Sequence, residues 1–113
     1  EGGCSVIPHE PEQPDLQQAV AEFDAGAGHL HIKDIRFGAQ IIAVALQVHT
    51  DVGFKIQSVA IINDALSSRP AYFDFDSLLL DIPQVAAFGQ LFTVQLKYLP
   101  LEELFVIERV APL

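Results

Sequence analysis

The sequence is poor in cysteine, tryptophan, methionine and positive charge. Its 113 residues include one cysteine, no tryptophan and no methionine, and six Lys and Arg stand against fifteen Asp and Glu, for a net charge of −9. A single cysteine excludes an internal disulfide. Because so acidic a surface repels phosphate backbones, we expect no nucleic-acid partner. No apolar run reaches the roughly 18 residues that a membrane-spanning helix needs.

Apolar residues, in contrast, are plentiful enough to build a core. Half of the residues are hydrophobic and the mean hydropathy is +0.33, which is typical of one globular domain at this length. The first residues differ from the rest, because prolines alternate there with acidic residues: Pro8, Glu10, Pro11, Glu12, Pro14 and Asp15. We therefore predict a flexible, proline-rich tether over residues 1–14 and a single folded domain over residues 15–113.

Cys4 lies at the start of this tether and has two interpretations. It is either a free thiol or the acylated first residue of a bacterial lipoprotein. Gly2 and Gly3 fit the cleavage site of a lipoprotein signal, whereas Glu1 stands where that signal has an apolar residue. The solvated, proline-rich spacer directly after Cys4 favours lipidation, because an anchored domain needs such a spacer.

Hydrophobic periodicity predicts a mainly β domain. Asp15 is a suitable N-cap, apolar residues follow it at helical spacing, and Gly26 and Gly28 end the pattern, so the segment predicts a short helix or a loosely ordered stretch. A single helical turn is also predicted after Pro83. Alternation and β-branched residues predict strands over 29–37, 40–49, 53–63, 71–76, 91–99 and 104–110. Short strands without βαβ spacing indicate a small antiparallel β-sandwich with one short N-terminal helix.

The strand predicted over 40–49 is apolar on both faces, and no internal repeat is apparent. One face holds Ile42, Val44, Leu46 and Val48, and the other holds Ile41, Ala43 and Ala45. A strand of this kind is either covered on both sides or presents its second face to a partner.

The polar residues form no catalytic or metal-binding motif. His29, His31 and His49 are three imidazoles on neighbouring strands, but no fourth zinc ligand lies at a motif spacing. Asp74, Asp76 and Asp81 lack the glycine-bearing loop of a calcium site and fit the polar face of an edge strand. No nucleophile elbow and no phosphate-binding glycine loop is present. We expect no enzymatic activity, no metal, no cofactor and no small-molecule substrate.

Three segments in order, "GAQIIAVALQV", "RPAYFDFD" and "LFTVQLKYL", together with Cys4 and its acidic spacer, resemble the YscW-like pilotins of type III secretion and their YbaY-type lipoprotein relatives. The resemblance covers roughly residues 38–98. It implies an outer-membrane lipoprotein of the bacterial periplasm, anchored through an acyl group on Cys4, that binds a secretin subunit and assists its targeting and assembly.

A pilotin of this kind needs an anchor, a spacer and a surface that captures a segment of its client. We expect that surface to involve the second face of the two-faced strand or a later apolar run, with partner-binding residues Ile41, Ala43, Ala45, Leu78, Leu79, Leu80 and Ile82. The main alternative is a soluble periplasmic binding or inhibitor module without catalytic activity. A small zinc-binding domain and a self-associating subunit of an envelope assembly are further alternatives.

Overall fold

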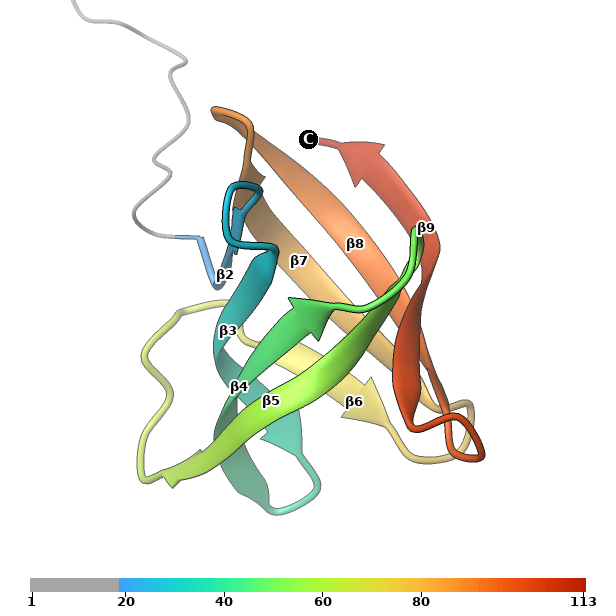
Figure 1. The fold of residues 1–113 in the computed structure, drawn as a ribbon. Coiled ribbons are helices and arrows are strands. Elements are labelled where there is room, and N and C mark those ends of the chain that lie inside the picture. The colour runs from blue at the N-terminus through green and yellow to red at the C-terminus, as the bar shows by residue number, and fades with distance from the viewer. Residues whose placement is uncertain (1–18) are drawn as a thin grey trace, which may run out of the picture.

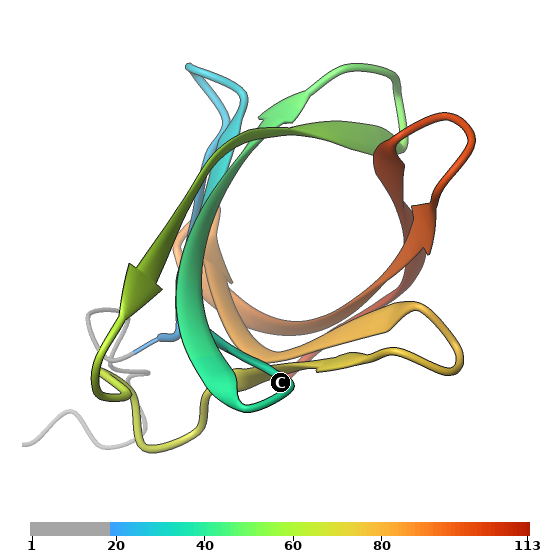
Figure 2. The ribbon, with the colours of Figure 1, turned by 90° about the horizontal axis from the view of Figure 1, so that it is seen from below.

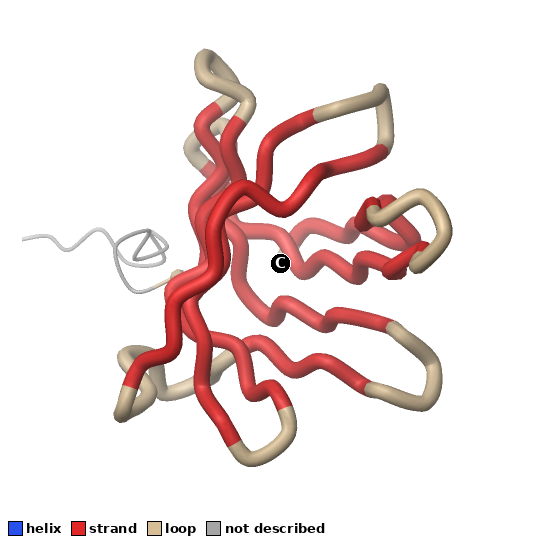
Figure 3. Tube along the Cα trace, turned by 60° about the horizontal axis from the view of Figure 1, so that its bottom comes forward, coloured by secondary structure: helices blue, strands red, loops and turns tan. Residues whose placement is uncertain are grey.

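The computed structural model describes residues 19–113, and all of this part of the chain is strand or loop (Figure 3). The prediction of a mainly β domain is therefore confirmed. Cys4 and the predicted tether lie outside the described residues. The strands are β2 (Ala21–Asp24), β3 (His29–Phe37), β4 (Gln40–Val48), β5 (Gly53–Ile62), β6 (Ala71–Asp74), β7 (Leu79–Ala87), β8 (Gln90–Leu99) and β9 (Leu104–Pro112).

The strands form one closed barrel where two stacked sheets were expected. Their order is β2-β3-β4-β5-β9-β8-β7-β6, and two further parallel pairings, β2 with β7 and β3 with β6, join the ends of that order. The strands accordingly wrap around a common interior (Figures 1 and 2). Sequence periodicity indicates the inward and outward faces of a strand but not the parallel pairings that close the sheet.

The barrel consists of two repeats of four strands, so the expectation that the chain has no internal repeat is wrong. Residues 50 positions apart are identical at several core and turn sites, including Phe23 and Phe73, and Asp24 and Asp74. The pairing repeats as well, because Phe23 lies opposite Leu30 as Phe73 lies opposite Leu80. The closing contacts are also reciprocal, with β2 on β7 and β6 on β3. The molecule therefore has approximate two-fold symmetry.

The helix predicted from Asp15 is wrong over Ala21–Asp24, which form strand β2. Ala21 is buried between its partners on β3 and β7. Asp24, at the end of the strand, accepts the backbone N–H groups of Gly26 and Ala27 on its Oδ1, which stabilises the turn that leads into β3. Strand pairing with two neighbours outweighs the weak helical propensity of a short segment.

The helical turn predicted after Pro83 is wrong too, because Pro83 lies inside β7. The register between β7 and β8 shifts between Ile82 and Val85, and the same shift occurs between Ile32 and Ile35 in the first repeat. A β-bulge at this point accommodates a residue without a backbone N–H. Proline here therefore marks a bulge.

The core fills the barrel interior with side chains from every strand. Alternating residues of β8 point inward as predicted, with Leu96 fully buried and Tyr98 packed against the core. The buried cluster comprises Val20, Ala21, Leu30, Ile32, Ile35, Ile42, Val44, Leu46, Phe54, Ala71, Phe73, Leu80, Ile82, Val85, Leu96 and Phe105.

Candidate functional site: an open edge of strand β5

The seam between β5 and β9 is where the barrel is least complete. These strands pair only at Gly53 with Val106 and at Phe54 with Phe105. Beyond Phe54, β5 continues for eight residues while staying paired with β4 on its other side. Within residues 19–113, the segment Lys55–Ile62 thus has a strand on one side only (Figure 1).

The inward face of this open segment is apolar and exposed. Val59 and Ile61 lie opposite the buried Val44 and Ile42, yet 53% and 66% of their surfaces are accessible because no strand of the described chain covers them. With Ile56 they form one wall of a groove of about 270 Å³. We call this the β5 groove. Its other lining residues are Ile35, Phe37, Gln40, Ile42, Val44, Phe73, Leu80 and Phe105.

Aromatic rings gather at one end of the β5 groove. Phe37 and Phe73 stack with centroids 5.5 Å apart, and Phe75 contacts Phe37 at 4.8 Å and Phe73 at 5.3 Å, both edge to face. Phe75 is itself largely exposed. This cluster provides a rigid apolar surface against which an incoming side chain can pack.

The outward face of the same strands holds three of the predicted partner-binding residues. Ile41, Ala43 and Ala45 lie directly opposite Ile62, Ala60 and Ser58, respectively. All three are half-buried. The second face of the two-faced strand therefore lies next to the open edge, and its role in binding stays a prediction.

The other four predicted residues lie on a different wall of the barrel. Leu80 and Ile82 are core residues at 1% exposure, although Leu80 also lines the floor of the β5 groove. Leu78 packs against the core from a turn, and Leu79 is half-buried. The structure does not bring Leu78 to Ile82 together with Ile41 to Ala45 on one exposed surface. A binding role for the run stays a prediction.

The second repeat has the equivalent edge on β9, but with different residues. Val110 lies opposite Val94 as Val59 lies opposite Val44. Beyond its pairing with β5, however, β9 carries Glu108 and Arg109, both exposed, and Pro112. Charged residues and proline are common devices that keep a free edge from pairing with another chain. The segment Ile56–Ile62 has neither charge nor proline.

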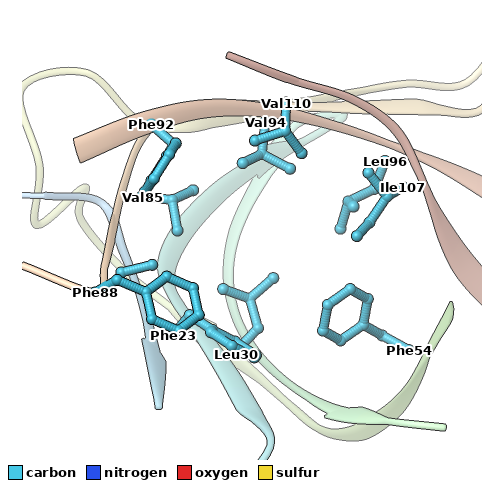
Figure 4. A pocket seen from close by; sticks show the side chains of 11 residues that line it. Phe23, Leu30, Phe54, Val85, Phe88, Phe92, Val94, Leu96, Ile107 and Val110 are labelled. Atoms are coloured by element: carbon cyan, nitrogen blue, oxygen red, sulfur yellow. The ribbon is translucent and has the colours of Figure 1, made fainter. Parts of the chain in front are cut away.

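A second apolar cavity, of about 230 Å³, lies beside β9 and is related to the β5 groove by the repeat (Figure 4). We call it the β9 cavity. It is lined by Phe23, Leu30, Phe54, Val85, Ala87, Phe88, Phe92, Val94, Leu96, Ile107 and Val110. Phe88 at its rim adopts a left-handed backbone with φ of 53°. That conformation costs a residue with a Cβ atom about 1–2 kcal/mol.

The buried carboxylate of Asp34 is a feature that sequence reasoning missed. Its Oδ2 accepts the backbone N–H groups of Leu66 at 2.5 Å and Ser67 at 2.8 Å, while Oδ1 has no partner among the described residues. These two residues belong to the loop over 63–70 that follows β5. Asp34 therefore fixes the chain at the end of the open strand. The sequence gives little signal for this role, because Lys33 and Arg36 make Asp34 look like one more residue of a polar, exposed strand face.

The histidines and the acidic residues singled out in the sequence do not cluster into a metal-binding group within the described chain. No group of three metal-ligating side chains occurs within residues 19–113. Asp74 Oδ1 accepts the N–H of Asp76 at 2.8 Å, and this hydrogen bond lowers the pKa of Asp74. Asp81 instead accepts a hydrogen bond from Gln95 at 2.7 Å. The acidic residues thus stabilise turns and strand pairs.

Comparisons with protein families, with characterised proteins and with solved structures find no match to this chain. The likeness to pilotins consequently depends on the sequence segments alone. No helix in the described part is long and apolar enough to cross a membrane.

Proposed function

We propose that this protein is a non-catalytic binding module that takes up an extended segment of a client protein as an added strand on β5. The observation that carries the proposal is the unprotected edge of Ile56–Ile62, which is unpaired on one side and exposes Ile56, Val59 and Ile61 beside a groove. A long apolar edge of this kind is either an interaction site or a cause of aggregation.

Strand addition would use both the unpaired backbone of β5 and the β5 groove. Backbone N–H and C=O groups on the open side of β5 would pair with the client backbone, which supplies affinity independent of sequence. Alternate client side chains would then enter the β5 groove, since successive side chains of a strand point to opposite faces. The cluster of Phe37, Phe73 and Phe75 would select a large apolar side chain at one of those positions.

Charge favours a different protein over a second copy of this chain as the occupant. The chain has a net charge of −9, so two copies repel each other, whereas a client with basic residues beside its apolar segment is attracted. The β5 edge itself has Lys55 as its sole charged residue among the described positions 53–62. We therefore expect the client's apolar residues to face the groove and its basic residues to flank it.

The specific role that we propose is that of a pilotin: an outer-membrane lipoprotein, anchored through Cys4 in the periplasm, whose client is a secretin subunit. The sequence resemblance supports this role, and so does a site suited to capturing a peptide segment. The alternative, a soluble periplasmic binding or inhibitor module, would use the same edge without an anchor and without a secretin client.

The proposal is tested with short overlapping peptides that tile a secretin subunit, titrated against the protein by fluorescence anisotropy. Val59→Lys should weaken binding of the best peptide by about tenfold or more, because it places a charge in an apolar groove and on a pairing edge. Val110→Lys is the matched control at the equivalent position of the other repeat and should leave binding unchanged.

Two results would overturn parts of the proposal. Equal binding by both variants would show that β5 is not the docking edge. Tight binding of unrelated basic-apolar peptides, with no secretin peptide bound, would retain the edge but exclude the pilotin role.

A further inference from the structure

The rim of the β9 cavity holds an aromatic residue that folding alone does not explain. Phe88 lies in the two-residue turn between β7 and β8, is 73% exposed and has a φ of 53°. The equivalent turn of the first repeat has Gly38, with a φ of 65°, which is the residue that this conformation favours. The second repeat therefore places a large apolar ring where glycine suffices.

Phe88 buries too little surface within the protein to offset the energetic cost of its left-handed backbone. Leu78 also adopts a left-handed backbone, with a φ of 62°, but its side chain packs against the core. The ring of Phe88 lies beside Phe23, with centroids 6.0 Å apart (Figure 4), and most of its surface is exposed. Strained residues of this kind are concentrated at ligand sites.

We infer that the β9 cavity binds a small, uncharged aromatic molecule, with Phe23 and Phe88 at its entrance. All of the lining side chains are apolar, so the ligand needs no hydrogen-bonding group inside. Phe23 packs edge to face against Phe54, with ring centroids 6.3 Å apart. A bound aromatic ring could therefore pack against the face of one of these rings and the edge of the other. The volume of about 230 Å³ exceeds the ~150 Å³ of an apolar cavity that accepts benzene, which indicates a ligand of two or three rings.

The neighbouring strand favours a free molecule over a peptide as the ligand. Glu108, Arg109 and Pro112 make the edge of β9 unsuited to strand addition, so no backbone pairing would hold a polypeptide there. The net charge of −9 also disfavours an anionic ligand. This ligand site was not expected from the sequence and is separate from the β5 groove.

The inference is tested by titrating the protein with N-phenyl-1-naphthylamine, an uncharged aromatic whose fluorescence rises in apolar sites. Phe88→Asn should lower its affinity by about tenfold or more, while the thermal midpoint stays equal or rises, because asparagine tolerates a left-handed backbone. Val110→Phe, a second variant at the exposed rim, should also block binding by filling the entrance. Val59→Lys, in the β5 groove, should change the affinity by less than about twofold.

Three outcomes would overturn the inference. The first is an unchanged affinity in Phe88→Asn. The second is loss of binding in Val59→Lys but not in Val110→Phe, which would place the probe in the β5 groove. The third is displacement of the probe by dodecanol at lower concentrations than by naphthalene, which would show that the cavity prefers a flexible chain to a ring.

Discussion

Val59 and Val110 occupy equivalent positions in the two repeats, each opposite a valine of the preceding strand, Val44 and Val94 respectively. Both are about half exposed, yet the strands that carry them differ. Val59 lies in the uncharged segment Ile56–Ile62, whereas Val110 follows Glu108 and Arg109. Because the two edges occupy equivalent places in the fold, the difference in sequence is the reason that we propose β5, and not β9, as the docking edge.

The apolar run Leu78–Ile82 offers a test of which wall of the barrel binds a client. Leu79→Asp should leave the protein folded, because Leu79 is half-buried and lies opposite Lys97 on β8. Leu80→Asp should unfold it, because Leu80 is fully buried and a charge there has no partner. Circular dichroism shows whether each variant is folded, and peptide titration shows whether a folded variant still binds the client. Loss of client binding in a folded Leu79→Asp variant would contradict docking at β5 and favour the run.

The side chain of Asp34 should contribute substantially to the free energy of unfolding, because it accepts two backbone hydrogen bonds from the loop after β5. Asp34→Ala leaves the N–H groups of Leu66 and Ser67 without their acceptor, so we expect a loss of about 1–3 kcal/mol in the free energy of unfolding. Gln84→Ala, at the equivalent position of the second repeat, is the control and should cost at most about 0.5 kcal/mol. Urea denaturation measures both. Equal costs would refute the assigned role of Asp34.

The lowered pKa of Asp74 predicts a pH dependence of stability. The backbone N–H of Asp76 donates to its ionised form, so the folded pKa lies below the usual 3.8. The contribution of the ionised carboxylate is therefore fully present above about pH 4 and is lost as the pH falls through the folded pKa. The stability difference between the wild type and Asp74→Asn should shrink on going from pH 7 to pH 2.5. A difference that stays constant would contradict this assignment.

Acylation of Cys4 is a prediction from the sequence and is tested in cells. The chain, expressed with a bacterial lipoprotein signal region ahead of Cys4, should incorporate radioactive palmitate and sediment with membranes. Cys4→Ser should remove both properties. If neither form takes up label, Cys4 is an ordinary thiol, and the soluble binding module becomes the better description of the protein.

Much of the strand pattern could be read from the sequence, since alternation fixes which residues of a strand face inward. The strands over 40–49 and 91–99 were predicted within about a residue of β4 and β8. The predictions for Pro83 and for the short strand β2 are wrong, because the bulge depends on the register with the neighbouring strand β8, and β2 depends on a pairing with β7 that is far away in the sequence. The same reason explains why a sandwich was expected where the barrel closes.

The open edge was also difficult to predict from the sequence alone. Ile56, Val59 and Ile61 look like ordinary core residues of a strand, and only the early divergence of β5 from β9 exposes them. The repeat offers a signal, because "IQSVAII" aligns with "IERVAPL" 51 positions later, and the first segment lacks the charges and the proline of the second.

The central claim is that a client pairs with the open side of β5, and amide hydrogen exchange by NMR tests it most directly. In the free protein, the amides of Lys55–Ile62 that do not donate to β4 should exchange rapidly. Addition of a bound secretin-derived peptide should slow these amides strongly and leave those of Ile107–Ala111 on β9 unchanged. Protection that appears on β9 instead, or on neither strand while the peptide is bound, would contradict the account.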